Sequence, residues 1–297
     1  MNIIIDCDPG VDDALAILTA AKQPELNILA ITSVSGNLPG EITYKNAKLL
    51  AQAAGLSCPV GRGADQPLVK EARNAGVTHG SDGLGGHAIE LAAYEKPYEV
   101  LDAVEVLKEQ LLASDEKVVL VVLGPMTNIA LLFQKYPEVK DKIEKISFMG
   151  GSLCGGNANT YGEFNIYVDP EAAGIVIESG IPMIMAGLDV TLKAFVTKDD
   201  LKVWEDLGNP IAAFAAHCCL HYGSHDPALH DPCSILVLTH PELFTTMLGK
   251  LSVCCDEGDH RGETYLNPVS KSDICTILQN VDRKAFIGHI TEALKQY

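Results

Sequence analysis

Four carboxylates lie in one short segment near the start of the chain, Asp6-Cys7-Asp8-Pro9-Gly10-Val11-Asp12-Asp13. Carboxylates this close repel one another unless a cation joins them. Oxygen-rich clusters of this kind suit hard cations such as Ca²⁺ or Mg²⁺. The alternative is that Asp12 or Asp13 only caps a helix, but that explains neither Asp6 nor Asp8. The segment therefore predicts a cation site.

A histidine beside an acid, in His230-Asp231-Pro232, could act as a general acid next to a metal ligand. The alternative is that Asp231 caps a helix that begins at Pro232, a common arrangement. The same tripeptide occurs at His225-Asp226-Pro227, so the motif alone is weak evidence. His79, in the Gly-rich stretch 61–86, is similarly open to a catalytic or a structural role.

Amides and a carboxylate lie close together in the segment 156–165, as Asn157, Glu163 and Asn165. Together they could hydrogen-bond several hydroxyl groups of a sugar, although Asn and Gly are also ordinary turn residues. Leu123 ends an apolar run before Gly124-Pro125, so its carbonyl could face a cation. From spacing alone, a plain turn capped by Thr127 or Asn128 is the favoured interpretation there.

The elements around the acidic segment would place it at the carboxyl end of a strand in a sheet. The apolar run Ile3-Ile4-Ile5 predicts a buried strand, Pro9-Gly10 a turn, and the apolar residues after Asp13 a helix. The acids would then lie at the carboxyl end of a strand and at the positive end of a helix. Open α/β sheets bind their ligands at such positions.

Strand-like and helix-like patterns alternate along the rest of the chain. Predicted strands cover 27–33, 118–123, 145–149, 182–186, 251–255 and 274–278, and predicted helices cover 44–54, 101–113, 127–134, 170–179 and 282–295. This alternation predicts an α/β fold with a mostly parallel open sheet and helices on both faces, similar to a Rossmann core. No linker or repeat divides the chain, so we expect a single domain over residues 1–297.

The composition limits the partners. The net charge of −17 over 297 residues disfavours nucleic acid and anionic membranes. The nine cysteines have no Cys-x-x-Cys spacing, and no leader precedes the first strand, so we expect reduced thiols in a cytoplasmic protein. No apolar run is long enough to predict a membrane span.

Taken together, the motifs resemble the nucleoside hydrolase family of the inosine–uridine-preferring type, in order and over nearly the whole chain. The acidic segment, continued to Ala14, resembles the family signature. Supporting motifs are Gly36-Asn37, Leu123 to Asn128, Met149-Gly150-Gly151, Asn157 to Asn165, Val168 to Ala172, Gly187 to Thr191 and His230-Asp231-Pro232. The resemblance implies hydrolysis of the N-glycosidic bond of ribonucleosides, and a homodimer or homotetramer.

The resemblance also implies roles for individual residues. A bound Ca²⁺ would be held by Asp8, Asp13, the Leu123 carbonyl and Asp231, and Asp8 would also be the general base. The ribose diol would be held by Asn37, Asp12 and Asn165, and the 5′-hydroxyl by Asn157 and Glu163. His79 and His230 would face the nucleobase, with His230 as the acid that helps it leave.

Two alternatives and one departure remain at this stage. A non-catalytic nucleoside sensor could share the fold, and Asp6-x-Asp8 at a strand end could belong to an aspartate-nucleophile phosphohydrolase, although Gly10 argues against this. The segment 217–223, with its cysteines and histidines, departs from the family pattern where base-contacting groups often occur. The preferred nucleobase therefore stays open.

Overall fold

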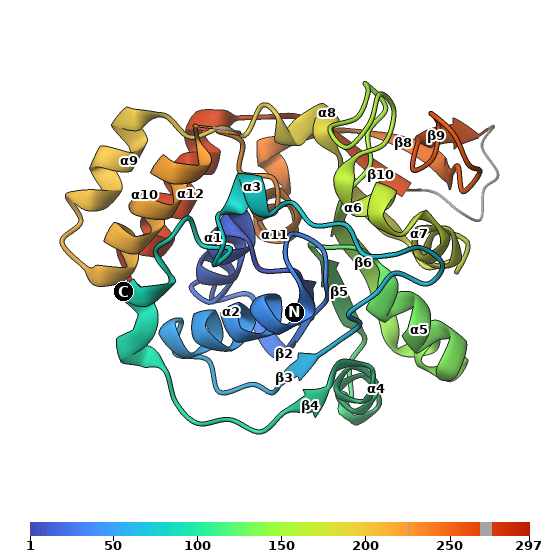
Figure 1. Ribbon diagram of the computed structural model, residues 1–297, viewed down its shortest axis with the longest axis horizontal. Helices are drawn as coiled ribbons and strands as arrows, with labels where there is room; N and C mark the ends of the chain where they lie inside the picture. The colour runs from blue at the N-terminus through green and yellow to red at the C-terminus, as the bar shows by residue number, and fades with distance from the viewer. Residues whose placement is uncertain (225, 268–274) are drawn as a thin grey trace.

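The computed structural model describes residues 1–224, 226–267 and 275–297, and it shows an α/β architecture (Figure 1). One sheet of ten strands runs through the described part of the chain. The strands are β1 (Asn2–Cys7), β2 (Asn27–Ser33), β3 (Val60–Arg62), β4 (Leu101–Asp102), β5 (Val118–Val122), β6 (Ile143–Met149), β7 (Met183–Ala186), β8 (Phe244–Val253), β9 (Thr264–Asn267) and β10 (Cys275–Val281).

The strand order β4-β3-β2-β1-β5-β6-β7-β10-β8-β9 places β1 between β2 and β5. In this order, each neighbouring pair from β4 as far as β10 is parallel. The last two pairs, β10 with β8 and β8 with β9, are antiparallel. The chain leaves β1 toward one edge of the sheet and later returns to β1's other side. Such a reversal opens a crevice at the carboxyl ends of the strands, where open α/β sheets bind ligands.

Helices cover both faces of the sheet. They are α1 (Val11–Ala20), α2 (Gly40–Ala53), α3 (Gly76–His79), α4 (Ala103–Ala113), α5 (Thr127–Lys135), α6 (Phe164–Val168), α7 (Pro170–Ile177), α8 (Leu188–Thr191), α9 (Lys198–Glu205), α10 (Pro210–Tyr222), α11 (Pro232–Thr239) and α12 (Arg283–Leu294). In the described residues, short 3₁₀ helices also cover Ala88–Tyr94, Pro137–Lys142 and Pro241–Leu243.

Alternation along the central strands divides the core between the two faces. Ile3 and Ile5 of β1 belong to the apolar cluster that contains α1, α2, α10, α11 and α12, whereas Ile4 belongs to the cluster of α4, α5 and α7. Successive side chains of a strand point to opposite faces, and both faces are covered here. The continuous apolar run at the N-terminus therefore marks a strand buried on both sides.

The predicted elements agree with the structure in kind, and several bounds need correction. The strand expected at 251–255 is the end of β8, which begins at Phe244 and stops at Val253. The helix expected from Leu101 begins at Ala103, because Leu101–Asp102 form β4 against β3. Ile274, expected in a strand, lies outside the described residues. No helix in the described residues is long and apolar enough to cross a membrane.

Candidate active site

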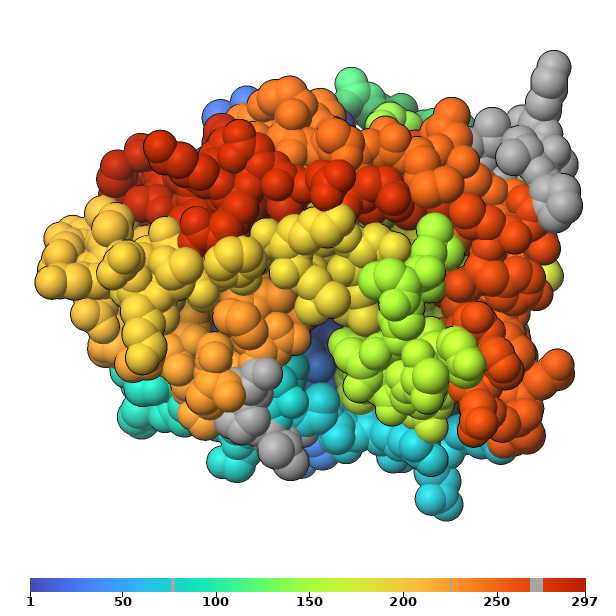
Figure 2. Space-filling view, turned by 90° about the horizontal axis from the view of Figure 1, so that it is seen from above, coloured from blue at the N-terminus to red at the C-terminus, as the bar shows by residue number. Residues whose placement is uncertain are grey.

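A cavity of about 290 Å³ lies at the carboxyl ends of the central strands. Figure 2 shows a hollow on this face, with blue N-terminal residues at its floor and yellow-green, cyan and orange segments around it. The residues that line the cavity are Asp12, Asn37, Ala75, Thr78, His79, Leu123, Met149, Asn157, Glu163, Phe164, Asn165, Tyr222, Asp226, His230 and Asp231. Nearly every site residue expected from sequence is in this set; Asp8 and Asp13 are buried beneath it.

Three carboxylates converge at the floor of the cavity. Oxygen atoms of Asp12, Asp13 and Asp231 all lie within 4.8 Å of one another, and the three residues are buried. Asp231 precedes α11, but its side chain makes no capping hydrogen bond to that helix. The alternative interpretation is thus correct in position, since Asp231 is the N-cap residue and Pro232 begins the helix, but the Asp231 carboxylate is directed to the cluster rather than to the helix.

Asp13 orders the turn that carries the cluster. It accepts hydrogen bonds from the backbone N–H of Asp8 (3.2 Å) and of Gly10 (2.9 Å), so both of its oxygens are engaged. Gly10 is the N-cap residue of α1, and Asp12 and Asp13 lie inside its first turn. Neither Asp is therefore the N-cap, and their charges face the positive end of the helix.

The carboxylates of the cluster resist ionising together. Burial raises the pKa of Asp12 to about 7, and the charge of Asp13 adds to the shift. Burial, followed by the charge of Asp12, raises the pKa of Asp231 well above its ordinary value. No Lys or Arg is among the described residues that line the cavity. A cation would therefore stabilise the ionised forms that the protein alone disfavours.

Asp8 lies beside this cluster but outside the group of three. Its Oδ2 accepts a hydrogen bond from the Asn37 backbone N–H at 2.6 Å, while the buried Oδ1 has no hydrogen-bond partner. A Cβ on Gly36 or Gly124 would collide with this carboxylate, so both glycines are required by close approach. Burial and the charge of Asp13 raise the pKa of Asp8 well above its usual value.

Amide groups join the next two strands to the site. Asn165 donates its side-chain N–H to the carbonyl of Leu123 (2.6 Å), which directly follows β5, and to that of Met149 (3.2 Å), which ends β6. The side-chain N–H of Asn37 donates to the Asp8 carbonyl (3.3 Å) and to Asp13 Oδ2 (3.2 Å).

Neither Thr127 nor Asn128 caps α5, so the capping interpretation after Leu123 is wrong.

Glu163 fixes the corner on which Asn165 stands. Its carboxylate caps α6 by accepting from the backbone N–H of Asn165 (3.0 Å) and Ile166 (3.4 Å), and it also accepts from Gly151 (2.9 Å). Burial raises its pKa. Asn157 lies on the exposed side of the cavity, where its Oδ1 accepts from the Phe164 N–H at 2.8 Å. Both residues thus have structural partners and line the cavity.

His230 is held at both ring nitrogens. Its Nδ1 pairs with Thr191 Oγ1 at 2.8 Å and its Nε2 with Asp226 Oδ2 at 3.0 Å. Burial alone would lower the pKa of His230, but the hydrogen bond to Asp226 and the charge of Asp12 outweigh it and raise the pKa. Asp226 belongs to the second His-Asp-Pro motif, whose His225 lies outside the described residues. Its role beside His230 was not predicted.

The pKa of His79 is shifted in the opposite direction from that of His230. Burial and the nearby charge of His230 lower its pKa to about 3, and its Nδ1 accepts a hydrogen bond from the Val11 N–H at 3.2 Å. Its ring lies 5.1 Å from that of Tyr222, at an angle of 30°. Tyr222 lines the cavity from the segment that departs from the family pattern. In the sequence, the only signal for Tyr222 as a cavity residue was that its segment precedes His230.

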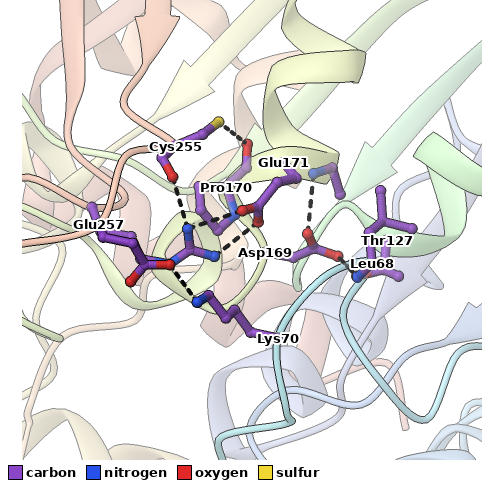
Figure 3. Close-up of polar contacts among 10 residues, drawn as sticks. Leu68, Lys70, Thr127, Asp169, Pro170, Glu171, Cys255 and Glu257 are labelled. Atoms are coloured by element: carbon purple, nitrogen blue, oxygen red, sulfur yellow. Dashed lines mark hydrogen bonds and ion pairs between the residues drawn. The ribbon is translucent and has the colours of Figure 1, made fainter.

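A polar network supports the α6–α7 corner from outside (Figure 3). Asp169, between α6 and α7, accepts from the Leu68 N–H (2.9 Å), the Thr127 hydroxyl (2.7 Å) and the Ala172 N–H (3.1 Å). Arg261 forms a two-pronged ion pair with Glu171 at 2.9 and 2.8 Å. The polar residues of the Val168 to Ala172 motif, Asp169 and Glu171, therefore hold in place the α6–α7 corner that carries Asn165.

The family model described as inosine-uridine preferring nucleoside hydrolase matches residues 3–288. The chain belongs to this family. Among its relatives, the pyrimidine-specific ribonucleoside hydrolase RihA of Enterobacter sp. (strain 638) is 40% identical over 310 residues, which cover 100% of this chain and 98% of that protein. The RihA of Salmonella typhi is also 40% identical, with 99% of that protein covered.

Solved structures of nucleoside hydrolases share the fold. The purine-preferring ribonucleoside hydrolase from Gardnerella vaginalis has a TM-score of 0.90 and 31% identity, with 100% of this chain and 98% of that chain covered. The plant nucleoside hydrolase PpNRh1 also has a TM-score of 0.90, with 29% identity, 100% of this chain and 99% of that chain covered. This nucleoside hydrolase is therefore a glycosidase that cleaves N-glycosyl bonds and releases the nucleobase of ribonucleosides.

Proposed function

We propose that this nucleoside hydrolase cleaves pyrimidine ribonucleosides with the help of one bound Ca²⁺. The observation that supports the cation is the buried carboxylate cluster, together with the lack of any Lys or Arg among the described residues that line the cavity. The RihA relatives, named as pyrimidine-specific and matched over their full length, support the choice of base. The solved structure named as purine-preferring is less similar in sequence, at 31% identity.

The donor set of the site fits Ca²⁺. The available groups are carboxylates and a carbonyl, which are the oxygen ligands that hard cations take. We assign Asp8, Asp13, Asp231 and the Leu123 carbonyl as ligands. The unpartnered Oδ1 of Asp8 supports this set, and the Leu123 carbonyl keeps a lone pair beside the Asn165 hydrogen bond. A bound Ca²⁺ would make a neighbouring water more acidic and would hold ribose hydroxyls.

Asp8 then acts as the general base. Its Oδ2 is fixed by the Asn37 N–H, so Oδ1 would use one lone pair toward the cation and the other to accept the proton of the attacking water. The water's oxygen forms the new bond to the anomeric carbon as the bond to the base breaks. Asp8 is buried, so bulk water does not compete for its carboxylate.

The remaining polar groups of the cavity hold the ribose. Asp12, Asn37 and Asn165 would bind the 2′- and 3′-hydroxyls, and Asn157 and Glu163 the 5′-hydroxyl. Each of these side chains lines the cavity. Binding energy at every hydroxyl can be used to distort the sugar toward its oxocarbenium-like transition state. A bound metal would take the place that a second carboxylate has in ordinary glycosidases.

His230 would donate the proton to the departing base. Its Nε2 hydrogen bond to Asp226 supports a protonated ring, and its Nδ1 is fixed by Thr191. The donated proton would be that of Nε2, which would exchange Asp226 for the base. His79 would contact the base as a neutral ring, since its Nδ1 is occupied by the Val11 N–H. Protonation removes the need to expel the nucleobase as an anion.

Assays of ribose release from a panel of purine and pyrimidine ribonucleosides test the proposal. We expect turnover of uridine or cytidine with a higher kcat/KM than that of inosine, and loss of activity when a chelator removes the metal. Preference for inosine would overturn the choice of base. Binding of every nucleoside without turnover would instead identify a non-catalytic sensor.

We also propose that residues 1–297 form one domain and that the chain assembles as a homodimer or homotetramer. The single sheet, from β4 to β9, supports the first statement. The family resemblance supports the second. Sedimentation of the intact chain tests the assembly state, and a monomer at assay concentration would contradict it.

A further inference from the structure

A second group of metal-ligand side chains lies outside the carboxylate cluster. Among the described residues, His87, Glu90 and His217 place one ligand atom each within 4.8 Å of the others. We propose that these three side chains form a site for a transition-metal cation of the Zn²⁺ type. The site is separate from the proposed Ca²⁺ site and does not depend on it.

The contacts within the group show both imidazoles directed at one carboxylate. His87 Nδ1 lies 2.7 Å from Glu90 Oε1, and His217 Nδ1 lies 3.0 Å from both oxygens of Glu90. The two imidazole rings are 5.3 Å apart at an angle of 36°. Ligands around a tetrahedral Zn²⁺ are roughly 3.3 Å apart, given Zn–N distances near 2.0–2.1 Å. Small side-chain adjustments would therefore create the site.

The chemistry of the group selects the metal. Imidazole nitrogens suit Zn²⁺, Cu²⁺ and Ni²⁺, whereas Ca²⁺ prefers oxygen alone. Two histidines and one carboxylate leave a fourth position for water, as zinc sites with three protein ligands do. The side chains are 32%, 31% and 38% exposed for His87, Glu90 and His217, so an ion can reach them from solvent. The net charge of −17 also favours cations at the surface.

A third group, His240, Glu242 and His289, is a weaker candidate and serves as the comparison. Its only hydrogen bond that joins an imidazole to the carboxylate is longer, 3.3 Å between His240 Nδ1 and Glu242. Glu242 is 66% exposed, and the two imidazole rings stack at 3.7 Å rather than converge on the acid. An ion there would first have to order a solvated side chain.

The proposed site would join two segments that form one wall of the cavity. Glu90 lies on the 3₁₀ helix that follows the His79 loop, and His217 lies on α10, whose last residue is Tyr222. The Cys218 thiol already donates to the Leu84 carbonyl at 3.1 Å, so the two segments are in contact beside the site. A cation would therefore fasten the loop of His79 to the helix of Tyr222.

Calorimetric titration with Zn²⁺ tests the site in the full-length, Ca²⁺-loaded protein with excess Ca²⁺ and no substrate. We expect the wild type to bind Zn²⁺, His217→Gln to weaken the tightest binding at least tenfold, and the matched control His289→Gln to leave it unchanged. Circular dichroism of both variants checks that they are folded. Saturating Zn²⁺ should raise the Tm of the wild type and His289→Gln, but not of His217→Gln.

Three outcomes would overturn the site: no Zn²⁺ binding by the wild type, equal binding by His217→Gln, or weakened binding only in His289→Gln. Co²⁺ as a substitute provides a spectroscopic test of the ligands. A thiolate charge-transfer band would show cysteine ligation and would also overturn the assignment. Because no substrate is present, these results are independent of the proposed hydrolysis.

Discussion

The carboxylates at the cavity floor and those at the α6–α7 corner are partnered in opposite ways. Glu171 is neutralised by the guanidinium of Arg261, and Asp169 accepts three hydrogen bonds from N–H and O–H donors (Figure 3). Asp12, Asp13 and Asp231 instead lie within 4.8 Å of one another, and no Lys or Arg is among the described cavity residues, although Asp13 also accepts hydrogen bonds from Asp8, Gly10 and Asn37. The acids of the corner are thus compensated by protein groups, whereas the crowded acids of the floor keep negative charge that a cationic ligand could neutralise.

The largest expected effect concerns the ligand side of this comparison. A 2′-deoxyribonucleoside lacks the hydroxyl that Asp12 and the cation would bind, so buried polar groups stay unpaired. We expect kcat/KM to fall roughly 10⁴-fold relative to the matching ribonucleoside. Steady-state kinetics with uridine and 2′-deoxyuridine measure the ratio. Similar values for the two substrates would remove the diol from the proposed binding scheme.

Asp8→Asn should lower kcat by at least roughly a hundredfold, because the amide keeps the shape but cannot accept a proton. Metal content measured in parallel separates loss of the base from loss of the cation. Asp6→Asn is the matched control: Asp6 is also buried and lies two residues before Asp8, but its Oδ1 accepts hydrogen bonds from Thr32 and Asn128 and it is not one of the proposed metal ligands. Near-normal kcat in Asp8→Asn with metal retained would exclude the base role.

His230→Ala should slow natural nucleosides at least roughly tenfold more than p-nitrophenyl riboside. The p-nitrophenolate leaving group needs no proton, so it does not depend on an acid. Asp8→Asn should slow both substrates, since each reaction requires an activated water. Equal losses for the two substrates in His230→Ala would show that His230 only supports its neighbour Asp231.

Glu171→Gln tests the structural side of the comparison. The Arg261 side chain is 9% exposed and would lose its charged partner, so we expect a loss of about 1–3 kcal/mol in the free energy of unfolding. Urea denaturation measures it, and kcat at low temperature should stay close to that of the wild type. Glu257→Gln is the control, because Glu257 pairs with Lys70 in solvent and should leave the Tm unchanged. A large loss of kcat in folded Glu171→Gln would contradict the division of roles.

Sequence patterns predicted the strands and helices that are long enough to show a clear pattern of apolar residues. The run Ile3 to Ile5 and the strand at 27–33 were found because strands buried in a parallel sheet are continuously apolar. Strands β3, β4 and β9 were not predicted. They have three, two and four residues, too few to carry a period, and they are defined by pairing with distant strands.

The site was predicted where the residue types are unusual. The acids of residues 6–13 stand out because no single cap explains them. The family resemblance supplied Asn37 and gave roles to Leu123 and Asn165, which the residue pattern alone left open. Tyr222 and Asp226 could not be assigned in this way. Tyr222 reaches the cavity from the end of α10, and Asp226 acts through the ring of His230, so both depend on tertiary contacts.

The cluster of Asp12, Asp13 and Asp231 joins the start of the chain to a residue far along it. During synthesis, the first two acids therefore leave the ribosome long before the third. In that interval the strands that follow Asp231 in the sequence have not been made. Domains generally fold as units during synthesis, and contacts of such sequence separation form late. Chains that end before Asp231 would lack one carboxylate of the cluster whatever their remaining structure. Such chains should therefore not form the proposed cation site.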